Sequence, residues 1–321
     1  MNNMIKKIPV PMAGLILALA ATGNLLLSYG SIFRNSFGIV SAIFLILLTI
    51  KLVSMPKSLG EGFENPVIAS VMPTFSMGLM LLSTYLKPYL PSGAYVVWIL
   101  GLVIHVFLLM YFTQKYIFNF NIKKVFPSYF IVYVGIVCGS VTAPAFGLAG
   151  LGQSIFWFGF VSYLILLPFV FYRVLKVKEI PEPSMPTIAI FAAPASLCLA
   201  GYLNAFQDKN TIMIGFLGIL SLIMFIFVMT QMPKMLKLKF YPSYSAFTFP
   251  FVITGIAMKG TNAFLTKAGY EISPLGYFIK FLEAWSVIMV LYVSVKYILF
   301  ITADPKDSIS SQKQVQVGSI T

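Results

Sequence analysis

Apolar residues occur in long runs along this chain, and short polar segments separate the runs. A helix needs about 20 apolar residues to cross the hydrocarbon core of a bilayer. On that scale the sequence predicts ten membrane-spanning helices, which we number as spans 1 to 10. The spans cover residues 9–28, 35–53, 66–84, 93–114, 127–148, 152–173, 186–206, 211–232, 241–264 and 275–299. The gaps after spans 1, 5 and 7 are very short, so these pairs are expected to form helical hairpins.

The predicted fold class is therefore an all-α integral membrane protein of ten transmembrane helices. The transmembrane domain is expected to cover residues 1–301. The remaining residues, 302–321, are rich in Ser, Gln and Asp and lack an apolar run. Such a composition buries too little apolar surface to fold, so we expect a disordered cytoplasmic tail.

Basic residues in the gaps indicate the orientation. With an even number of spans, both termini lie on one side of the membrane. Of the 22 Lys and Arg residues, sixteen fall on that side, five on the other, and Lys280 is unassigned. The five are Arg34, Lys87, Lys209, Lys259 and Lys267. Because cytoplasmic loops carry an excess of Lys and Arg, both termini are predicted to be cytoplasmic, in a plasma or inner membrane.

Composition excludes several functional classes. The chain is 59% hydrophobic and 10% charged, with a mean hydropathy of +0.91, which is too apolar for a soluble globular protein. The net charge of +13 resides in the gaps and requires no nucleic-acid partner. Cys138 and Cys198 lie inside spans and are interpreted as small buried side chains. Without a metal-ligand cluster, paired carboxylates or a phosphate-binding loop, the sequence predicts no enzyme, cofactor or metal site.

Prolines mark an internal repeat in the odd-numbered spans. Pro73, Pro194 and Pro250 lie inside spans 3, 7 and 9. A proline within a helix removes one amide donor and frees the carbonyl four residues earlier, so each is expected to kink its helix and shape a pore. The freed carbonyls would be those of Ala69, Ile190 and Ala246. Spans 1 and 5 have no matching proline near their centres.

Small residues distinguish the same odd-numbered spans. The segments Cys138–Ala143 and Ala192–Ser196 are examples, whereas most even-numbered spans consist mainly of Leu, Ile, Phe and Val. Small side chains allow helices to approach closely. The pattern predicts five hairpins, with the odd helices lining a central pore and the even helices outside. The alternative is that the small residues only pack helices together.

Three motifs resemble the tellurite-resistance/dicarboxylate transporter family, which includes the slow-type anion channels of plants. They are Ile8-Pro9-Val10-Pro11 before span 1, Phe126-Pro127-Ser128-Tyr129-Phe130 at span 5, and Phe247-Thr248-Phe249-Pro250 in span 9. The spacing of the ten spans agrees over nearly the whole chain. This resemblance implies five hairpins around a pore, a homotrimer with one pore per subunit, and a phenylalanine in the ninth helix that plugs the pore. Phe249 matches that position.

Candidate pore residues follow from the kinks and from this resemblance. Phe249 is the predicted gate, and Met72 and Ala193 are its repeat-equivalent positions. A ring of apolar side chains at such a constriction would close the pore by excluding water. Hydroxyl groups at a similar depth are candidates to donate hydrogen bonds to an anion, although such groups more often bond to their own helix. These residues are Thr74, Ser76, Thr142, Ser196 and Thr248.

Ionisable residues inside spans are rare, and each is a candidate for function. Lys259 is expected at the outer pore mouth, where it would concentrate anions, or to extend its amine to the lipid headgroups. Lys280 and Glu283 are three residues apart, which predicts a structural pair on one helix face. His105 is the only histidine and is a candidate proton carrier for a coupled transporter, but its place in an outer helix favours a hydrogen-bonded packing role.

Three functions remain open at this stage. The first is passage of small inorganic or carboxylate anions through a pore that Phe249 occludes. The second is proton-coupled transport of a malate-like C4-dicarboxylate, or a tellurite-related transport, which would require a titratable group deep in the membrane. The third is a membrane structural or sensor subunit that conducts nothing, in which bulky side chains would fill every inner helix face.

Overall fold

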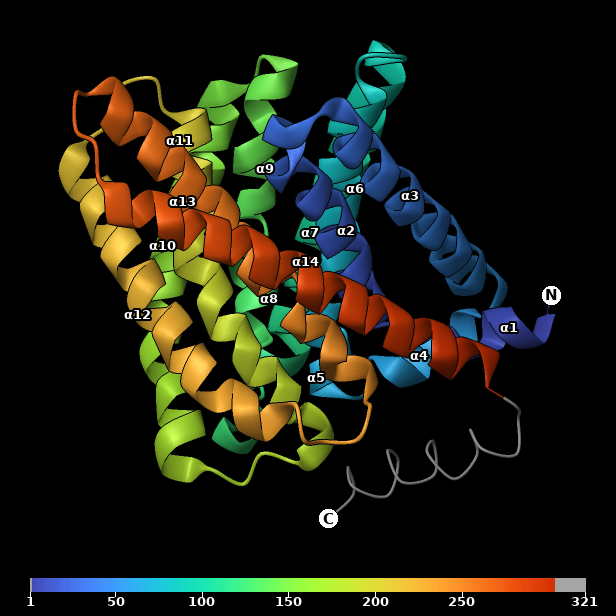
Figure 1. Cartoon of the computed structure of the whole chain (residues 1–321). Coiled ribbons are helices and arrows are strands. Elements are labelled where there is room, and N and C mark those ends of the chain that lie inside the picture. Colours follow the sequence, from blue (N-terminus) through green and yellow to red (C-terminus); the bar gives the residue numbers. More distant parts are fainter. Residues whose placement is uncertain (1, 304–321) are drawn as a thin grey trace.

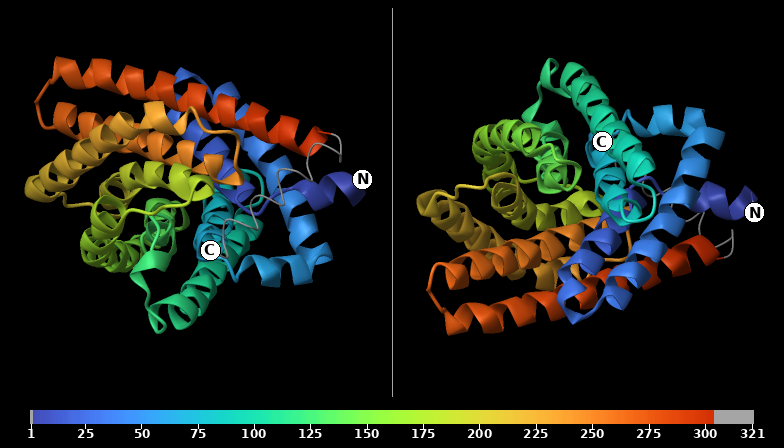
Figure 2. Two further views of the ribbon diagram at one scale, coloured as in Figure 1. Left: turned by 90° about the horizontal axis from the view of Figure 1, so that it is seen from below. Right: turned by 90° about the horizontal axis from the view of Figure 1, so that it is seen from above.

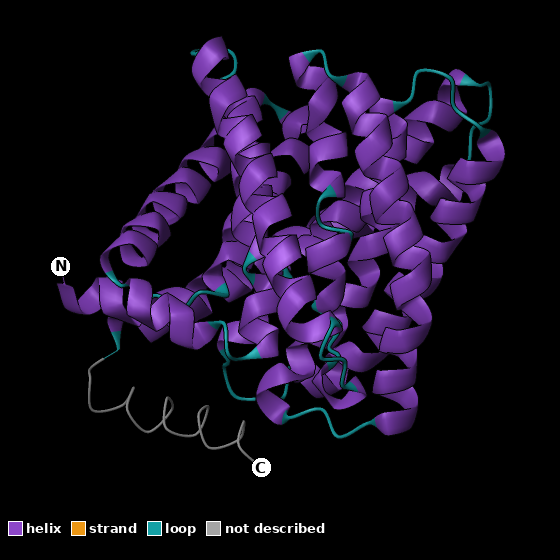
Figure 3. Cartoon of the chain, turned by 180° about the vertical axis from the view of Figure 1, so that it is seen from behind, coloured by secondary structure: helices purple, strands orange, loops and turns teal. Residues whose placement is uncertain are grey.

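The computed structural model describes residues 2–303, and this part of the chain contains helices and loops but no strand (Figure 1, Figure 3). The α-helices are α1 (Asn2–Lys7), α2 (Met12–Leu25), α3 (Ser31–Ser54), α4 (Pro56–Gly62), α5 (Pro66–Val71), α6 (Pro73–Leu86), α7 (Pro91–Phe112), α8 (Tyr129–Tyr133), α9 (Val137–Thr142), α10 (Ala149–Tyr172), α11 (Ala193–Ala205), α12 (Thr211–Met235), α13 (Phe249–Lys267) and α14 (Ser273–Thr302). The all-α prediction is confirmed. The predicted tail lies outside the described residues, apart from Thr302 and Ala303.

Short 3₁₀ and π helices join or extend these elements. They are η1 (Leu27–Tyr29), η2 (Thr113–Ile117), η3 (Ile122–Lys124), η4 (Ala143–Phe146), η5 (Arg173–Val177), η6 (Glu182–Ala192) and η7 (Pro242–Phe247). The π helices η2 and η5 extend α7 and α10, respectively. Lys7 Nζ donates a hydrogen bond to the carbonyl of Ala303, so the two ends of the described chain meet at one end of the bundle.

Seven helical segments between residues 2 and 303 are long and apolar enough to cross a membrane. They are Ser31–Ser54, Pro66–Leu86, Pro91–Ile117, Ala149–Val177, Glu182–Ala205, Thr211–Met235 and Ser273–Thr302. The apolar segments Met12–Leu25 and Val137–Phe146 are shorter. Each of the ten predicted ranges contains helix. The chain is thus a multi-pass membrane protein.

Burial separates the segments into two groups. In α3, α7, α10, α12 and α14, only 28% to 33% of the most apolar window is buried. The corresponding value is 72% for Pro66–Leu86 and 89% for Glu182–Ala205, and every residue of α2 except Asn24 is buried. Because lipid is apolar, a helix that faces lipid leaves apolar side chains exposed on the isolated protein. The first group therefore forms the outside of the bundle.

Contacts arrange the buried helices in a closed cycle. Helix α2 packs against α6, α6 against α9, α9 against α11, α11 against α13, and α13 returns to α2. On the outside, α3, α7, α10, α12 and α14 each pack against the inner helix that precedes them in the chain. Figure 2 views this arrangement from the two ends of the bundle. The cycle places the five inner segments around one common centre.

The three inner prolines stand at breaks within their spans, at the start of a helix. Pro73 is the first residue of α6, and Pro194 and Pro250 are the second residues of α11 and α13. Proline is well tolerated there because the first amides of a helix have no partner within it. The expected free carbonyl of Ile190 accepts a hydrogen bond from the amide of Ala193. The break avoids the unpaired group that a mid-helix proline would create.

Span 5 is broken as well, although it lacks the inner proline. Helix α8 ends at Tyr133, a turn follows, and α9 begins at Val137. Gly135 lies in that turn, and its amide donates to the carbonyls of Phe130 and Ile131. The glycine therefore stands at the break in this repeat, where the other three spans have a proline.

Candidate functional site

A cavity of about 60 Å³ lies at the centre of the cycle of inner helices. It is lined by Pro11, Gly14, Val67, Val71, Thr74, Met77, Phe130, Ile131, Val134, Gly135, Thr187, Ile190, Ala193, Pro194, Leu197, Ser243, Ser245, Ala246, Phe249 and Pro250. All five inner spans contribute to this set, and none of these lining residues belongs to α3, α7, α10, α12 or α14. Because one water needs about 10 to 15 Å³ of such space, the cavity has room for only a few waters.

Phe249 lies in the cavity wall at the first position of α13, and its side chain is 8% exposed. The chain leaves regular helical geometry just before it, because Thr248 has a φ of −111° and a ψ of −81°. Ala193, the first residue of α11, lines the same cavity and is also 8% exposed. Two positions predicted to be equivalent in the repeat thus face one space.

The other predicted pore residues divide into two groups. Thr74, Pro194 and Pro250 line the cavity. The remainder are not among its lining residues; they are Met72, Pro73, Ser76, Thr142, Ser196, Thr248 and Lys259. Thr187, Ser243 and Ser245 do line it, and the sequence analysis did not identify them. Thr187 lies in η6, and Ser243 and Ser245 lie in η7. These residues were missed because a 3₁₀ helix places a different set of residues on one face than an α-helix does.

The predicted hydroxyl groups are all bonded within the protein. Four donate to carbonyls of their own spans: Thr74 Oγ1 to Val71 O (2.7 Å), Thr142 Oγ1 to Cys138 O (2.8 Å), Ser196 Oγ to Ala192 O (2.8 Å) and Thr248 Oγ1 to Ser245 O (2.6 Å). Ser76 Oγ lies 2.7 Å from Pro73 O and 2.9 Å from His105 Nδ1. Thr187 Oγ1, in the cavity wall, donates to Ser184 O at 2.6 Å. A hydroxyl has one proton, so none of these groups offers a free donor to an anion.

The amides at the helix breaks are also occupied. Phe75 N donates to Met72 O at 2.9 Å, and Phe251 N donates to Thr248 O at 3.2 Å. Helix N-termini attract anions through such amides only when these are free to point at the ligand. The cavity surface is therefore almost wholly apolar, and its described lining residues carry no charged side chain.

His105 is fully buried and joins three segments outside the cavity. Its Nδ1 lies 2.9 Å from Ser76 Oγ of α6, and its Nε2 lies 3.1 Å from the carbonyl of Val132 in α8. Since a carbonyl only accepts hydrogen bonds, Nε2 carries a proton in this arrangement. The expected hydrogen-bonded packing role agrees with this geometry.

Lys259 and Glu283 form an ion pair that was not predicted. Lys259 Nζ lies 2.6 Å from Glu283 Oε1, while Lys280 is exposed and does not form the predicted pair with Glu283. The side chain of Glu283 is 7% exposed and that of Lys259 is 33% exposed. Tyr29 donates to Glu283 Oε2 at 2.6 Å, and this hydrogen bond raises the pKa of Tyr29. Lys280 and Glu283 are close in sequence, but Glu283 pairs with a lysine from another helix. Sequence spacing alone does not show which side chains neighbouring helices bring close.

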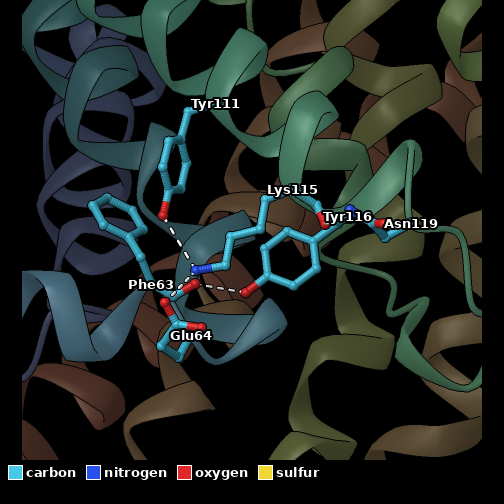
Figure 4. A network of polar contacts seen from close by, with 6 residues as sticks. All are labelled: Phe63, Glu64, Tyr111, Lys115, Tyr116 and Asn119. Atoms are coloured by element: carbon cyan, nitrogen blue, oxygen red, sulfur yellow. Dashed lines mark hydrogen bonds and ion pairs between the residues drawn. The ribbon is translucent and has the colours of Figure 1, made fainter.

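Figure 4 shows a polar network around Phe63 and Glu64, just before α5. Val67 and Val71 of α5 line the cavity. Lys115 pairs with Glu64, and Tyr116 donates to the carbonyl of Phe63 at 2.6 Å. Asn65 follows immediately and caps α5, accepting from the amide of Val67 at 2.9 Å. The π helix η2, which extends α7, supplies both Lys115 and Tyr116. These two residues link α7 to the segment that leads into α5.

We expect Gly135→Ala to destabilise the protein strongly. A Cβ at this position would lie 2.2 Å from the carbonyl oxygen of Ile131 and 2.7 Å from Met77 Sδ. Because backbone atoms cannot yield cheaply, the expected loss is about 3 kcal/mol, which is typical of overpacking in a core. Thermal unfolding in detergent would measure it. Gly218→Ala is the matched control, since nothing lies within 4 Å of a Cβ there. Equal melting temperatures for the two variants would contradict the prediction.

These features define an all-helical, multi-pass membrane protein whose buried helices enclose a small apolar space. The model of the SLAC1 family, the voltage-dependent anion channels, matches residues 7–300, and the chain belongs to this family. It is also similar to an uncharacterised transporter, MJ0762, of Methanocaldococcus jannaschii. The two are 26% identical over 260 residues, which cover 72% of this chain and 74% of the relative. The resemblance to the tellurite-resistance/dicarboxylate transporter family is confirmed, and this is a family of transporters and channels, not of enzymes.

Proposed function

We propose that this protein is a passive channel for small inorganic anions, with its pore through the centre of the five inner segments and Phe249 as the gate. The observation that carries the proposal is the single cavity to which every inner span contributes, with Phe249 in its wall. In this proposal ten spans form five hairpins, and both termini are cytoplasmic in a plasma or inner membrane. The family resemblance adds a homotrimer with one pore per subunit.

The apolar lining supports a closed, water-excluding constriction. A cavity with room for a few waters is too small for a hydrated ion to pass, and apolar walls do not replace lost hydration. Opening therefore requires Phe249 to move. Since no side chain of the described lining supplies a strong anion site, an ion that gives up water easily should pass more readily than one that holds it tightly. Nitrate and chloride fit this requirement better than malate, whose two carboxylates are strongly hydrated.

The charge distribution supports anions over cations. The protein carries a net charge of +13 at pH 7, and its basic residues lie mainly in the segments between spans. A positive potential at the pore mouths raises the local concentration of anions. The lining itself contains no residue that titrates near neutral pH, which favours passive flow over proton-coupled dicarboxylate transport.

Liposome flux distinguishes these functions. Purified protein, as wild type and as Phe249→Ala, would be tested with chloride, nitrate and malate, each with and without a pH gradient across the membrane. We expect chloride and nitrate to flow down their own gradients at rates that the pH gradient does not change. Malate accumulation driven by a pH gradient would establish the coupled carrier instead. Absence of any anion flux from both proteins would favour the structural or sensor subunit.

A further inference from the structure

Leu25, Ser28 and Tyr29 contact the ion pair of Lys259 and Glu283, and Lys259 lies near the middle of α13. Besides Glu283, Lys259 Nζ donates to the carbonyl of Leu25 at 2.9 Å and to Ser28 Oγ at 2.6 Å. Glu283 receives its second hydrogen bond from Tyr29. An ammonium group has three protons, and all three are used here. We call this set, formed by Leu25, Ser28, Tyr29, Lys259 and Glu283, the clasp.

The clasp connects three separate parts of the chain. Lys259 belongs to α13, Glu283 to α14, and the other members to the end of α2 and to η1. The helices also approach closely beside it, because a Cβ on Gly255 of α13 would lie 3.2 Å from Leu25 Cδ1. The middle of α13 is therefore held against α2 and α14.

Helix α13 is continuous from Phe249 to Lys267, so Phe249 and Lys259 move together. Lys259 follows Phe249 by ten residues, which is about 15 Å along a helix. At the Phe249 end, the irregular dihedral angles of Thr248 separate α13 from η7. Hinges lie at such element ends, where a few residues absorb a change in backbone angles. If the clasp allows α13 to rotate or shift, the phenyl ring of Phe249 in the cavity wall therefore moves with the helix.

We propose that Lys259 and Glu283 are positioning residues for the gate: their ion pair holds α13 in the closed position, and loss of the pair releases it. This inference rests on the proposed channel function. Without the carboxylate of Glu283, Lys259 loses its counter-ion and its strongest acceptor, and α13 is then less firmly held.

Few other charged groups face Glu283. Lys259 comes from α13 and Tyr29 from η1, while α2 has no titratable residue. On its own helix, Lys280 is exposed. The titratable groups of α1 and η7 that contact α14 lie near its other end, where Lys7 bonds to Ala303 O and the ring of Tyr244 lies 6.4 Å from that of Tyr292. The pair is thus the main electrostatic contact of Glu283 in the described chain.

Chloride efflux from liposomes, with the same pH on both sides, tests the proposal. The proteins are wild type, Glu283→Gln, Lys259→Met and the charge reversal Lys259→Glu with Glu283→Lys. Glu283→Gln should conduct about tenfold more than wild type, the change expected for loss of one charge-assisted hydrogen bond. Lys259→Met should behave similarly, and the charge reversal should restore low flux.

The matched control is Lys280→Gln, which removes a charge one helical turn from Glu283 without touching the clasp. It should keep the flux of wild type. A folded Glu283→Gln protein with wild-type flux would overturn the proposal. If both single variants fail to fold, a charge-reversed protein that folds but conducts as strongly as Phe249→Ala would do the same. The Phe249→Ala variant separates the channel proposal from the clasp proposal. If Phe249→Ala shows no flux, the channel itself is contradicted. If Phe249→Ala conducts but Glu283→Gln does not differ from wild type, only the role of the clasp is contradicted.

Discussion

Replacing Phe249 by Ala is expected to raise anion flux at least tenfold. The phenyl ring lies in the wall of a cavity that has room for only a few waters, and all five inner segments surround that cavity. Removing the ring widens the narrow apolar space, and a wider apolar constriction fills with water more readily. The gain should be largest for ions that shed water easily. Single-channel or macroscopic currents in planar bilayers would measure it.

Phe251→Ala is the matched control for this experiment. Phe251 lies two residues further along α13 and is fully buried, but it faces away from the cavity toward Phe225 and Trp285, with ring centres 6.1 and 5.8 Å away. The same chemical change there should destabilise the protein, by about 3 to 5 kcal/mol, without opening a path. Equal currents from the two variants would remove Phe249 from the role of gate.

The positions of the helices were predictable because the membrane imposes a simple rule. Backbone groups in lipid must bond internally, so long apolar runs become helices. Helix α2 is buried whereas α3 is exposed, and this difference likewise agrees with the small residues of span 1. Phe249 was identifiable from the proline that follows it and from the family resemblance, and it lies in the cavity wall.

The details of the site depended on contacts that sequence spacing does not reveal. Glu283 was paired with Lys280 because the two are near in sequence, yet it bonds to Lys259, which lies 24 residues away in the chain. Gly135 gave no signal because one glycine in an apolar run has many uses. The prolines were expected to free the carbonyls of Ala69, Ile190 and Ala246, but the carbonyl of Ile190 accepts a hydrogen bond from the amide of Ala193.

Moving the gate to the equivalent position of another repeat is a more demanding test of the pore. Phe249 begins α13, Ala193 begins α11, and both side chains border the same cavity. In a Phe249→Ala background, Ala193→Phe should therefore return an aromatic ring to the constriction and bring the flux back to near the wild-type value. Flux from the single and double variants, measured in the same liposome assay, would check this.

The corresponding control is Ala193→Ser in the same Phe249→Ala background. Serine adds one oxygen atom to the wall and leaves the enlarged space open, so this double variant should stay as conductive as Phe249→Ala. A folded Ala193→Phe double variant with equally high flux would show that the two positions do not share one permeation path. Restored closure would instead mean that occlusion depends on the volume of apolar side chains in this cavity and not on a specific contact of Phe249, because the ring would then act from a different helix.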